Sequence, residues 1–552
     1  MNKDYYKTKS GDSGKIKHLG VMIDCSRNSI MNIASIKKFL PILAKAGYNT
    51  VQLYTEDTFE VNNEPYFGYM RGRYSKEELK EIDTVAAGFG MELIPCIQTL
   101  AHLKNIFRWP VYRQVNDCND ILLAGEERTY RLIENIFDTL AECFTSRNVN
   151  IGMDEAHMLG LGKYLDMHGY TKRADIMLSH LNRINEIANS RGFTCSMWSD
   201  MFYFMAFGGK NYTADNVTVP DEINDKIPKN IKLIYWDYYS TDKSVYENTI
   251  RSHQKLSDNI IFAGGAWSWV GLTPLNYYGI RTSEAAILAC RENGIEEIFI
   301  TMWGDNGGYC SPFSVLPVLI HVAEYAKGDF DLKSIKTRFK EVVGINYDSF
   351  TAIDLPNFLN EKQDKGIKYN PSKYLLYNDI FMGINDSTIK EGGGEIYKKH
   401  ASQLKKLEKN GEYGFIFKTM RLLCDCLYYK ADLGIRTRQL YAAGDKTGIT
   451  ELVKERYKPL LKKLSDFYDA METYWHTLYK PFGFEITDIR LGGLMQRIKY
   501  ASKKLTAFAE GKIDRIRELE EKQLDRVGGG DIFERKLIVD NNWANIVTPN
   551  TL

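Results

Sequence analysis

Between about residue 18 and residue 330, short apolar runs alternate with longer amphipathic stretches, and this alternation constrains the fold more than any other feature of the chain. Each run is long enough for one buried strand, and the stretches between the runs carry apolar residues at helical spacing. Eight such strand–helix units in succession predict an α/β fold of the (β/α)8 TIM barrel type. The expected strands are residues 19–24, 48–54, 91–97, 148–153, 194–199, 231–236, 259–264 and 297–303.

A doubly wound open sheet is the alternative for a chain that alternates strands and helices. Such a sheet needs a glycine-rich phosphate-binding loop after its first strand. The segment DCSRNS at 24–29, which follows the first expected strand, contains no glycine. We therefore favour the barrel and assign residues 1–330 to it.

The composition changes after residue 330. A section around 354–372 is polar and rich in Asn and Lys, so residues 331–375 are predicted to be a linker or loop region. Long stretches with apolar residues at helical spacing follow, and they predict an antiparallel helical bundle in a C-terminal domain of residues 376–552. Near the end of that domain, residues 532–542 are expected to form a short strand.

Composition excludes several classes of function. The chain of 552 residues carries 72 basic and 71 acidic side chains, which gives no electrostatic case for binding nucleic acid or an anionic membrane. The polar N-terminus and the lack of a long apolar stretch predict a cytoplasmic protein, and nine irregularly spaced cysteines predict free thiols. No metal-ligand spacing and no phosphate loop occur, so neither a metal nor another cofactor is expected.

Polar and aromatic residues gather where the expected strands end, which is where barrel enzymes carry their functional groups. The fourth strand is followed by adjacent carboxylates, Asp154 and Glu155. Judged alone, this pair also fits a helix cap followed by a solvated turn residue. Five of the eight tryptophans follow strands five to eight, which predicts a pocket that holds the apolar face of a sugar ring. They are Trp198, Trp236, Trp267, Trp269 and Trp303.

The order of these signals resembles glycoside hydrolase family 20, the β-N-acetylhexosaminidases, over about residues 15–320. The family carries Asp-Glu at the end of strand four, as Asp154-Glu155 here, and Trp-Gly-acidic after strand eight, as Trp303-Gly304-Asp305 here, with Asp in place of the usual Glu. The other matching positions are Arg27, Asp57, His102, Trp198 and Trp236.

The resemblance implies an exo-acting enzyme that releases terminal β-linked GlcNAc or GalNAc by substrate-assisted, retaining hydrolysis. Glu155 is then the general acid and base, and Asp154 orients the substrate's acetamido group. His102 and Asp57 are expected to support Glu155. Arg27, Asp305 and the tryptophans are expected to bind the sugar.

Two departures from the family pattern point to a divergent, intracellular, bacterial-type branch. Leu19 stands where the family has an arginine that holds the outer hydroxyls of the sugar, and Arg27 is the candidate to replace it. The tyrosine that bonds the acetamido carbonyl is absent at the end of strand seven, where Trp267 and Trp269 occur. We nominate Tyr238 in its place.

Two other functions remain open at this point. A barrel glycosidase with a protein nucleophile would use Asp200, Asp237 or Asp305 opposite Glu155. A non-catalytic carbohydrate-binding protein would use the barrel for binding and the helical half for assembly. The apolar, glycine-containing stretch 480–500 predicts close packing on the barrel or on a second subunit, so a homodimer is a further expectation.

Overall fold

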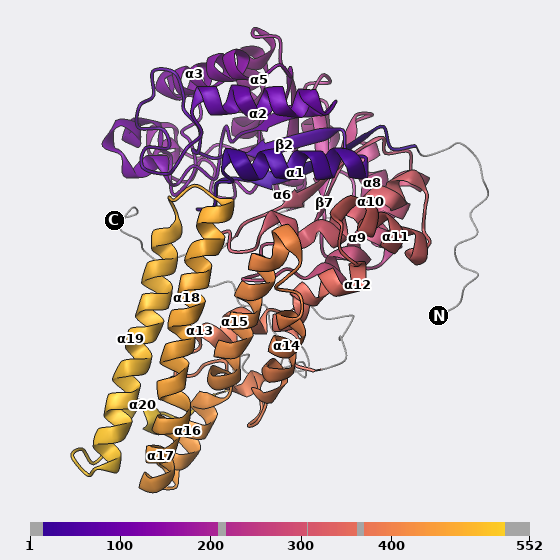
Figure 1. Cartoon of the computed structure of the whole chain (residues 1–552). Helices are drawn as coiled ribbons and strands as arrows, with labels where there is room; N and C mark the ends of the chain where they lie inside the picture. Colours follow the sequence, from indigo (N-terminus) through magenta and orange to yellow (C-terminus); the bar gives the residue numbers. More distant parts are fainter. Residues whose placement is uncertain (1–14, 208–216, 306, 361–368, 525–552) are drawn as a thin grey trace.

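The computed structural model describes residues 15–207, 217–305, 307–360 and 369–524 (Figure 1). Eight parallel strands close into a barrel in the order of the sequence, so the predicted fold class is confirmed. The strands are β1 (His18–Asp24), β2 (Thr50–Tyr54), β3 (Glu92–Cys96), β4 (Asn148–Asn150), β5 (Thr194–Trp198), β6 (Lys232–Trp236), β7 (Ile260–Gly265) and β8 (Glu297–Met302).

Helices surround the barrel and bury their apolar faces on it. In the third of them, α3, the buried residues Leu132, Ile136 and Leu140 recur four positions apart, so they form one face. Helix α2 begins with a capping box in which Ser75 and Glu78 satisfy each other's backbone N–H groups. The barrel helices are α1 (Ile33–Ala46), α2 (Lys76–Gly88), α3 (Glu127–Cys143), α4 (Lys163–His168), α5 (Arg173–Asn189), α6 (Asp200–Phe207), α7 (Asp221–Asn224), α8 (Lys243–Gln254), α9 (Asn276–Glu292) and α10 (Leu316–Lys327).

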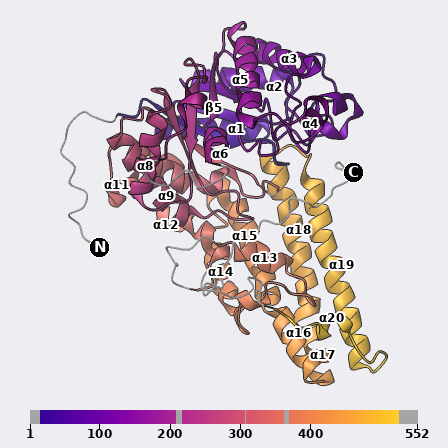
Figure 2. The same ribbon diagram turned by 180° about the vertical axis from the view of Figure 1, so that it is seen from behind.

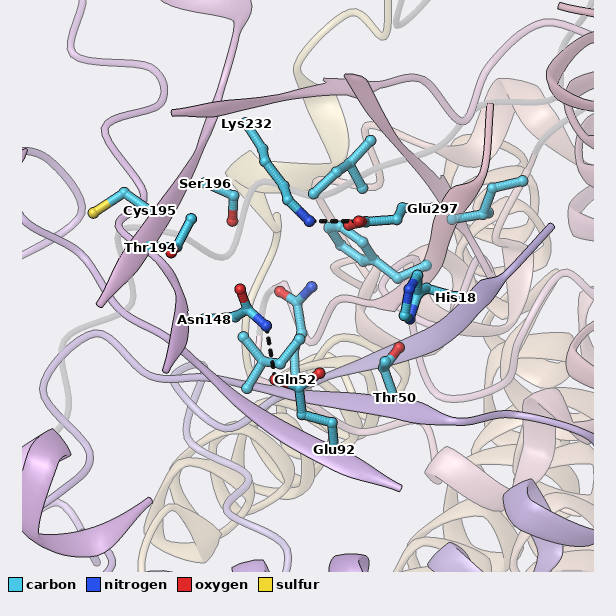
Figure 3. Close-up of a pocket in the computed structure, with 14 residues that line it drawn as sticks. His18, Thr50, Gln52, Glu92, Asn148, Thr194, Cys195, Ser196, Lys232 and Glu297 are labelled. Carbon is cyan, nitrogen blue, oxygen red and sulfur yellow. Dashed lines mark hydrogen bonds and ion pairs between the residues drawn. The ribbon is translucent and has the colours of Figure 1, made fainter. Parts of the chain in front are cut away.

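A polar cavity of about 640 Å³ lies at the amino ends of the strands (Figure 3). Its lining includes the first residues of most strands, and the side chains of Lys232 and Glu297 form an ion pair there. The Asn148 amide donates to Glu92 across two neighbouring strands (2.8 Å). This end of a (β/α)8 barrel generally serves stability rather than catalysis.

The described parts of residues 332–377 are largely helical, although the composition of this section predicted a linker. The segment contains α11 (Leu332–Val343), α12 (Tyr347–Phe350), the 3-10 helix η4 (Thr351–Asn357) and α13 (Pro371–Tyr377). The polar residues of α11 face outward while Ile335 and Phe339 are buried, so a polar composition concealed an amphipathic pattern. The division of the chain at residues 330 and 375 itself stays a prediction.

The C-terminal half is helical, as predicted, and extends away from the barrel (Figures 1 and 2). Its two longest helices, α18 (Lys458–Leu478) and α19 (Phe484–Ala509), run side by side in both views. The other helices are α14 (Glu395–Lys405), α15 (Gly414–Lys430), α16 (Leu433–Ala442), α17 (Lys446–Leu452) and α20 (Arg517–Glu520). The strand predicted at 532–542 lies outside the described residues.

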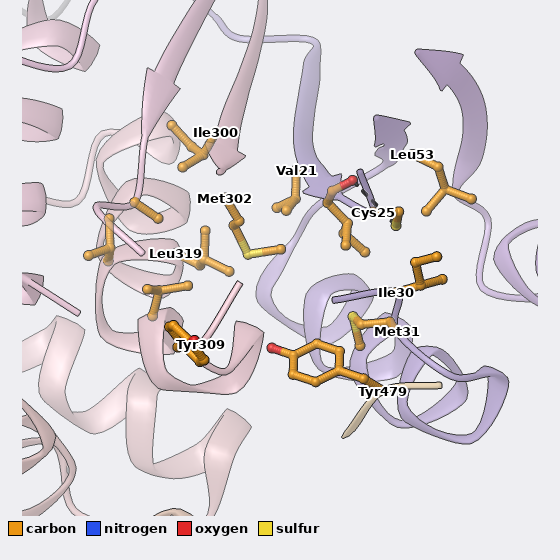
Figure 4. Close-up of a cluster of buried hydrophobic side chains, with 14 of the residues drawn as sticks. Val21, Cys25, Ile30, Met31, Leu53, Ile300, Met302, Tyr309, Leu319 and Tyr479 are labelled. Atoms are coloured by element: carbon orange, nitrogen blue, oxygen red, sulfur yellow. Dashed lines mark hydrogen bonds between the residues drawn. The ribbon is translucent and has the colours of Figure 1, made fainter. Parts of the chain in front are cut away.

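The turn between α18 and α19 is anchored on the barrel. Tyr479 pairs with Met31 as an isolated bridge, and its hydroxyl donates to the carbonyl of Cys310 (3.0 Å). Figure 4 shows Tyr479 among buried side chains of β1, β2 and β8. The backbone N–H of Lys480 donates to the carbonyl of Ile30 (2.8 Å). The helical half is therefore joined to the loop that follows β1.

Part of the stretch 480–500 packs on the barrel, where Arg490 donates to the hydroxyl of Tyr309 (2.7 Å). Ile489 and Tyr500 on the same helix are each 38% exposed, so this helix also has an open face. The homodimer stays a prediction. Among the helices of the described residues, none combines the length and the apolar character that a membrane span requires.

Candidate active site

A cavity of about 580 Å³ opens at the carboxyl ends of the strands. All of the predicted site residues except Asp57 and Trp267 line it. The lining residues are Arg27, His102, Asp154, Glu155, Trp198, Trp236, Tyr238, Tyr239, Trp269, Trp303 and Asp305.

Asp154 and Glu155 both reach this cavity because the chain leaves the sheet before them. Strand β4 ends at Asn150, three residues earlier than predicted. Gly152, Met153 and Glu155 then adopt left-handed backbone conformations, with φ values of 74°, 69° and 50°. Non-glycine residues in this region each cost about 1–3 kcal/mol, and such strain concentrates at functional sites. The turn thus cancels the strand alternation that would send two neighbouring side chains to opposite faces.

Gln98, the second residue after β3, holds this turn in place. Its side-chain oxygen accepts the backbone N–H of Met153 (3.2 Å), and its amide donates to Asp154 Oδ1 (2.7 Å) and to the hydroxyl of Tyr54 (3.0 Å). A side chain at position 152 would not fit, because its Cβ would lie 2.2 Å from Gln98 Oε1 and 2.7 Å from the carbonyl of Ile97.

His102 supplies a positive charge between the two acids. Its Nε2 lies 3.1 Å from Asp154 Oδ2 and 3.7 Å from Glu155 Oε2. The nearer contact has the distance of an ion pair. Burial opposes the charging of His102, yet the carboxylate of Asp154 outweighs it and raises the pKa of His102 to about 10. Burial likewise opposes the ionisation of Asp154, but His102 and Gln98 together lower the pKa of Asp154.

Glu155 experiences the opposite electrostatic environment. Partial burial and the negative charge of Asp154 raise its pKa, and half of its side chain (50%) is open to the cavity. Its backbone N–H donates to Asp200 Oδ2 (3.0 Å). The pKa values of these two adjacent carboxyl groups are therefore shifted in opposite directions.

Two charged residues from other loops, Arg27 and Asp305, also line the cavity. Arg27 Nη1 donates to Asp305 Oδ1 (2.9 Å), and its Nε donates to Glu56 Oε1 (3.1 Å). The carboxylate of Asp24 accepts the backbone N–H of Gly304 (2.8 Å) and so ties the loop after β8 to β1. Arg27 and Asp305, which are far apart in sequence, thus form one polar group facing the cavity.

Aromatic rings form the walls. Trp236 stacks on Tyr238 with 5.4 Å between ring centroids, and Trp303 packs edge-on against Tyr54 at 4.7 Å. The indole N–H of Trp303 donates to the hydroxyl oxygen of Tyr238 (3.1 Å), a bond that does not use the Tyr238 hydroxyl proton. The predicted cluster of tryptophans at one rim is therefore present, with the correction given next.

Two predicted site residues lie behind the cavity rather than in it. Asp57 is buried and pairs with Arg71 (3.3 Å), so the predicted relay from Asp57 through His102 is absent among the contacts of the described residues. Its neighbour Glu56 points toward Arg27 instead, because successive side chains after β2 alternate in direction. Trp267 is also buried, and its indole N–H donates to the carbonyl of Tyr238 (2.9 Å).

Sequence reasoning did not assign a site role to three residues that complete this arrangement. They are Glu56, Gln98 and Tyr239. For Glu56 the available signal was alternation, since it lies one residue from the predicted site residue Asp57. Within the described residues, no group of three or more His, Cys, Asp or Glu side chains has the arrangement of a metal site.

Comparison with protein families matches two parts of the chain. Residues 16–246 match the model described as glycosyl hydrolase family 20, catalytic domain, and residues 348–534 match the model of the glycoside hydrolase 20C C-terminal domain. Together these matches cover well over half of the chain.

Individual relatives are distant. Hexosaminidase D of Bos taurus is 22% identical over 348 residues, which are 57% of this chain and 93% of that protein. A beta-hexosaminidase of Vibrio furnissii is 25% identical over 26% of this chain and 30% of its own length. Among solved structures, the GH20 exo beta-N-acetylglucosaminidase of Vibrio harveyi is similar with a TM-score of 0.46 and 14% identity, over 61% of this chain and 59% of that one.

The crowded glycine at position 152 gives a first test of the site. We expect Gly152→Ala to lower kcat/KM by about 10²-fold, because the added Cβ displaces Gln98 and with it the turn that carries Asp154 and Glu155. The matched control is Gly192→Ala, since Gly192 has a similar φ of 78° but open space around it. Steady-state kinetics and thermal unfolding of both variants make the measurement. Equal losses of kcat/KM in the two variants would show that backbone strain, and not the packing of the Cβ against Gln98, causes the loss.

The His102–Asp154 pair predicts a pH dependence of stability. An unfolded histidine titrates near pH 6.5, whereas His102 in the folded protein has a pKa of about 10. A raised folded-state pKa contributes stability that is full below about pH 6.5 and is lost as the pH rises toward 10. We therefore expect the difference in unfolding free energy between wild type and His102→Gln to shrink from pH 6 to pH 10 in urea denaturation. A difference in unfolding free energy that stays constant from pH 6 to pH 10 would contradict a raised pKa of His102 in the folded protein.

Proposed function

Because the chain belongs to glycoside hydrolase family 20, and is therefore a glycoside hydrolase of the β-N-acetylhexosaminidase kind, we propose that it releases single terminal β-linked GlcNAc or GalNAc residues. We further propose that the substrate's own acetamido group is the nucleophile. The observation that carries this proposal is the convergence of two adjacent carboxyl groups, with pKa values shifted in opposite directions, on one aromatic cavity.

Opposite pKa shifts divide acid and base work between neighbouring carboxyl groups. Glu155, whose pKa is raised, retains a proton to donate to the departing glycosidic oxygen. Asp154, whose pKa is lowered, stays ionised and accepts the acetamido N–H. An ionised Asp154 also stabilises the positive charge that develops as the ring carbon loses its leaving group.

The proposed reaction has two steps. In the first, the acetamido carbonyl oxygen bonds to the anomeric carbon as the glycosidic bond breaks, and Glu155 transfers its proton to the leaving oxygen. The result is a cyclic oxazolinium ion beside Asp154. In the second, Glu155 takes a proton from water as that water attacks the anomeric carbon and the carbonyl oxygen departs. Both substitutions invert the anomeric carbon, so the overall outcome is retention.

The cavity walls support binding of a chain end. Trp303 and Trp236, which are only partly buried, offer apolar ring surface to the sugar, and Arg27 with Asp305 offers hydrogen-bonding groups for its outer hydroxyls. Tyr238 is our candidate to bond the acetamido carbonyl, because its hydroxyl lies in the wall and is fixed by Trp303. A pocket closed by the Arg27–Asp305 pair suits an exo-acting enzyme.

A protein nucleophile is less compatible with the surrounding contacts. Asp200 has both carboxylate oxygens occupied by N–H donors, from Glu155 and from Trp236. Asp237 accepts the backbone N–H of Tyr239 (2.9 Å) and does not line the cavity. Asp305 is engaged by Arg27 at the far side. These contacts favour the substrate's own oxygen over an enzyme carboxylate.

Aryl glycosides distinguish the two mechanisms. We expect rapid hydrolysis of aryl β-GlcNAc or β-GalNAc and very slow hydrolysis of aryl β-glucoside, which lacks the acetamido nucleophile. A GlcNAc-derived thiazoline, which imitates the oxazolinium, should inhibit far more tightly than GlcNAc, as intermediate analogues do. Comparable rates on β-glucoside, with a trapped glycosyl ester on an Asp, would overturn the proposal. Binding of these glycosides without any hydrolysis would favour a carbohydrate-binding protein instead.

Substitution of each acid should give a different kinetic pattern. We expect Asp154→Asn to lower kcat by about 10²–10³-fold with every aryl leaving group, comparable to the loss of one preorganised electrostatic group. Glu155→Gln should reduce the rate most for poor leaving groups, because those depend on proton donation. Michaelis–Menten kinetics with dinitrophenyl and phenyl β-GlcNAc measure both patterns. Indistinguishable profiles for the two variants would argue against separate roles.

A further inference from the structure

Asp200 lies directly behind the catalytic cavity and contacts two parts of it. It is the first residue of α6, two positions after Trp198 at the end of β5. Its Oδ2 accepts the backbone N–H of Glu155 (3.0 Å), and its Oδ1 accepts the indole N–H of Trp236 (3.3 Å). Only 7% of Asp200 is exposed, and it does not line the cavity. One carboxylate therefore connects the proposed general acid with an aromatic wall.

The two groups that Asp200 joins come from separate strands. Glu155 follows β4 and sits in a left-handed backbone conformation (φ 50°), which requires support from its surroundings. Trp236 is the last residue of β6, and its ring forms the cavity wall with Tyr238. A shift at either end changes the angle between the acid and the face on which the sugar would rest.

We infer that Asp200 is a positioning residue that fixes the general acid Glu155 relative to the Trp236 wall through its two carboxylate oxygens. This inference rests on the proposed function and extends it by one residue that does not touch the substrate. Holding reacting groups in the productive geometry is worth much of an enzyme's rate, and a displacement of about 1 Å can cost about 10²-fold.

The chemistry of the two bonds requires a carboxylate. Both partners are N–H donors, so both side-chain oxygens must accept. An asparagine has nearly the same shape but replaces one oxygen with an NH2 group, which would face a donor and lose that bond. Burial of an ionised group is costly in itself, and the two N–H donors compensate that cost only while both bonds are made.

The charge state of Asp200 gives the inference a second observable, the pH dependence of activity. Burial and then the negative charge of Asp154 raise the pKa of Asp200 to about 7. The groups that face it are Asp154 and Glu155 after β4 and the Trp236 indole of β6. Protonation converts one acceptor oxygen into a hydroxyl, so activity that depends on both bonds declines as the pH falls through this range.

The test uses Asp200→Asn in the full-length protein, with Asp354→Asn as the matched control. Asp354 is also buried and also accepts one side-chain and one backbone N–H, from Asn276 and Tyr277, but it lies in η4 outside the cavity. Rates are measured with phenyl and dinitrophenyl members of whichever aryl glycoside series the wild type cleaves fastest. The comparison of variants then does not depend on the identity of the sugar.

We expect Asp200→Asn to lower kcat about 10²-fold for the phenyl glycoside and less than about 5-fold for the dinitrophenyl glycoside, because only the former depends strongly on the acid. The acid limb of the wild-type pH profile near pH 7 should move to lower pH in this variant. Asp354→Asn should leave the ratio between the two leaving groups and the pH profile unchanged. Equal losses on both leaving groups would mean that Asp200 only stabilises the fold, and the inference would fail.

Trp236→Phe keeps an aromatic ring in the wall and removes the indole N–H that bonds Asp200 Oδ1. This variant should show the same preference for the good leaving group in smaller form, with kcat for the phenyl glycoside lowered by about 3–10-fold.

Binding of the GlcNAc-derived thiazoline, measured by calorimetry, gives a readout that needs no turnover. Asp200→Asn should weaken this binding by about 10-fold. If the wild type binds the thiazoline no better than GlcNAc, the proposed function fails. If it binds tightly and Asp200→Asn binds equally well with an unchanged leaving-group ratio, only the Asp200 inference fails.

Discussion

The site depends on a backbone constraint at the end of β4, where the chain turns out of the sheet through Gly152 and Met153. A strand continued to Met153, as its β-branched and apolar residues suggest, would send Asp154 and Glu155 to opposite faces. The left-handed turn brings both into the cavity, and Gln98 holds it by bonding Met153 and Asp154 together. Position 152 must be glycine because neighbouring backbone and side-chain oxygens leave no room for a Cβ. The catalytic geometry is thus fixed by hydrogen bonds to the main chain as much as by the carboxylates themselves.

Three buried or half-buried carboxyl groups share this small region with the imidazole of His102. The charge of His102 lowers the pKa of Asp154, whereas the pKa values of Glu155 and Asp200 are raised by burial and then by repulsion from Asp154. Interacting carboxyl groups titrate as a set rather than singly. Removing one member therefore alters the proton affinity of the others, and a substitution at His102, which lies 3.7 Å from Glu155, would also change the pKa of Glu155.

The barrel and the acid pair could be predicted from sequence because both rest on local patterns. Apolar runs of strand length recur eight times, and functional groups collect where such runs end. The partners of each group were harder to predict, because side-chain direction after a strand depends on one or two backbone angles. For this reason Glu56, and not the predicted Asp57, is the residue after β2 that contacts the cavity lining, through Arg27, and of the two predicted tryptophans after β7 only Trp269 lines the cavity. Helix α11 was missed because its polar outer face dominates its composition while its buried face carries few residues.

The contact between the α18–α19 turn and the barrel changes how the molecule should be divided. Tyr479 and Lys480 bond the backbone of Met31 and Ile30, which follow Arg27 in the same loop. The helical half therefore acts as an outer brace for the loop that carries Arg27, a residue of the cavity lining, and Lys480 extends this brace to the start of α2 through Glu78. An excised barrel would lose that brace and expose Met31 and Ile30 to water. In engineering terms, loop grafts at the pocket would have to respect the helical hairpin that contacts this loop from outside.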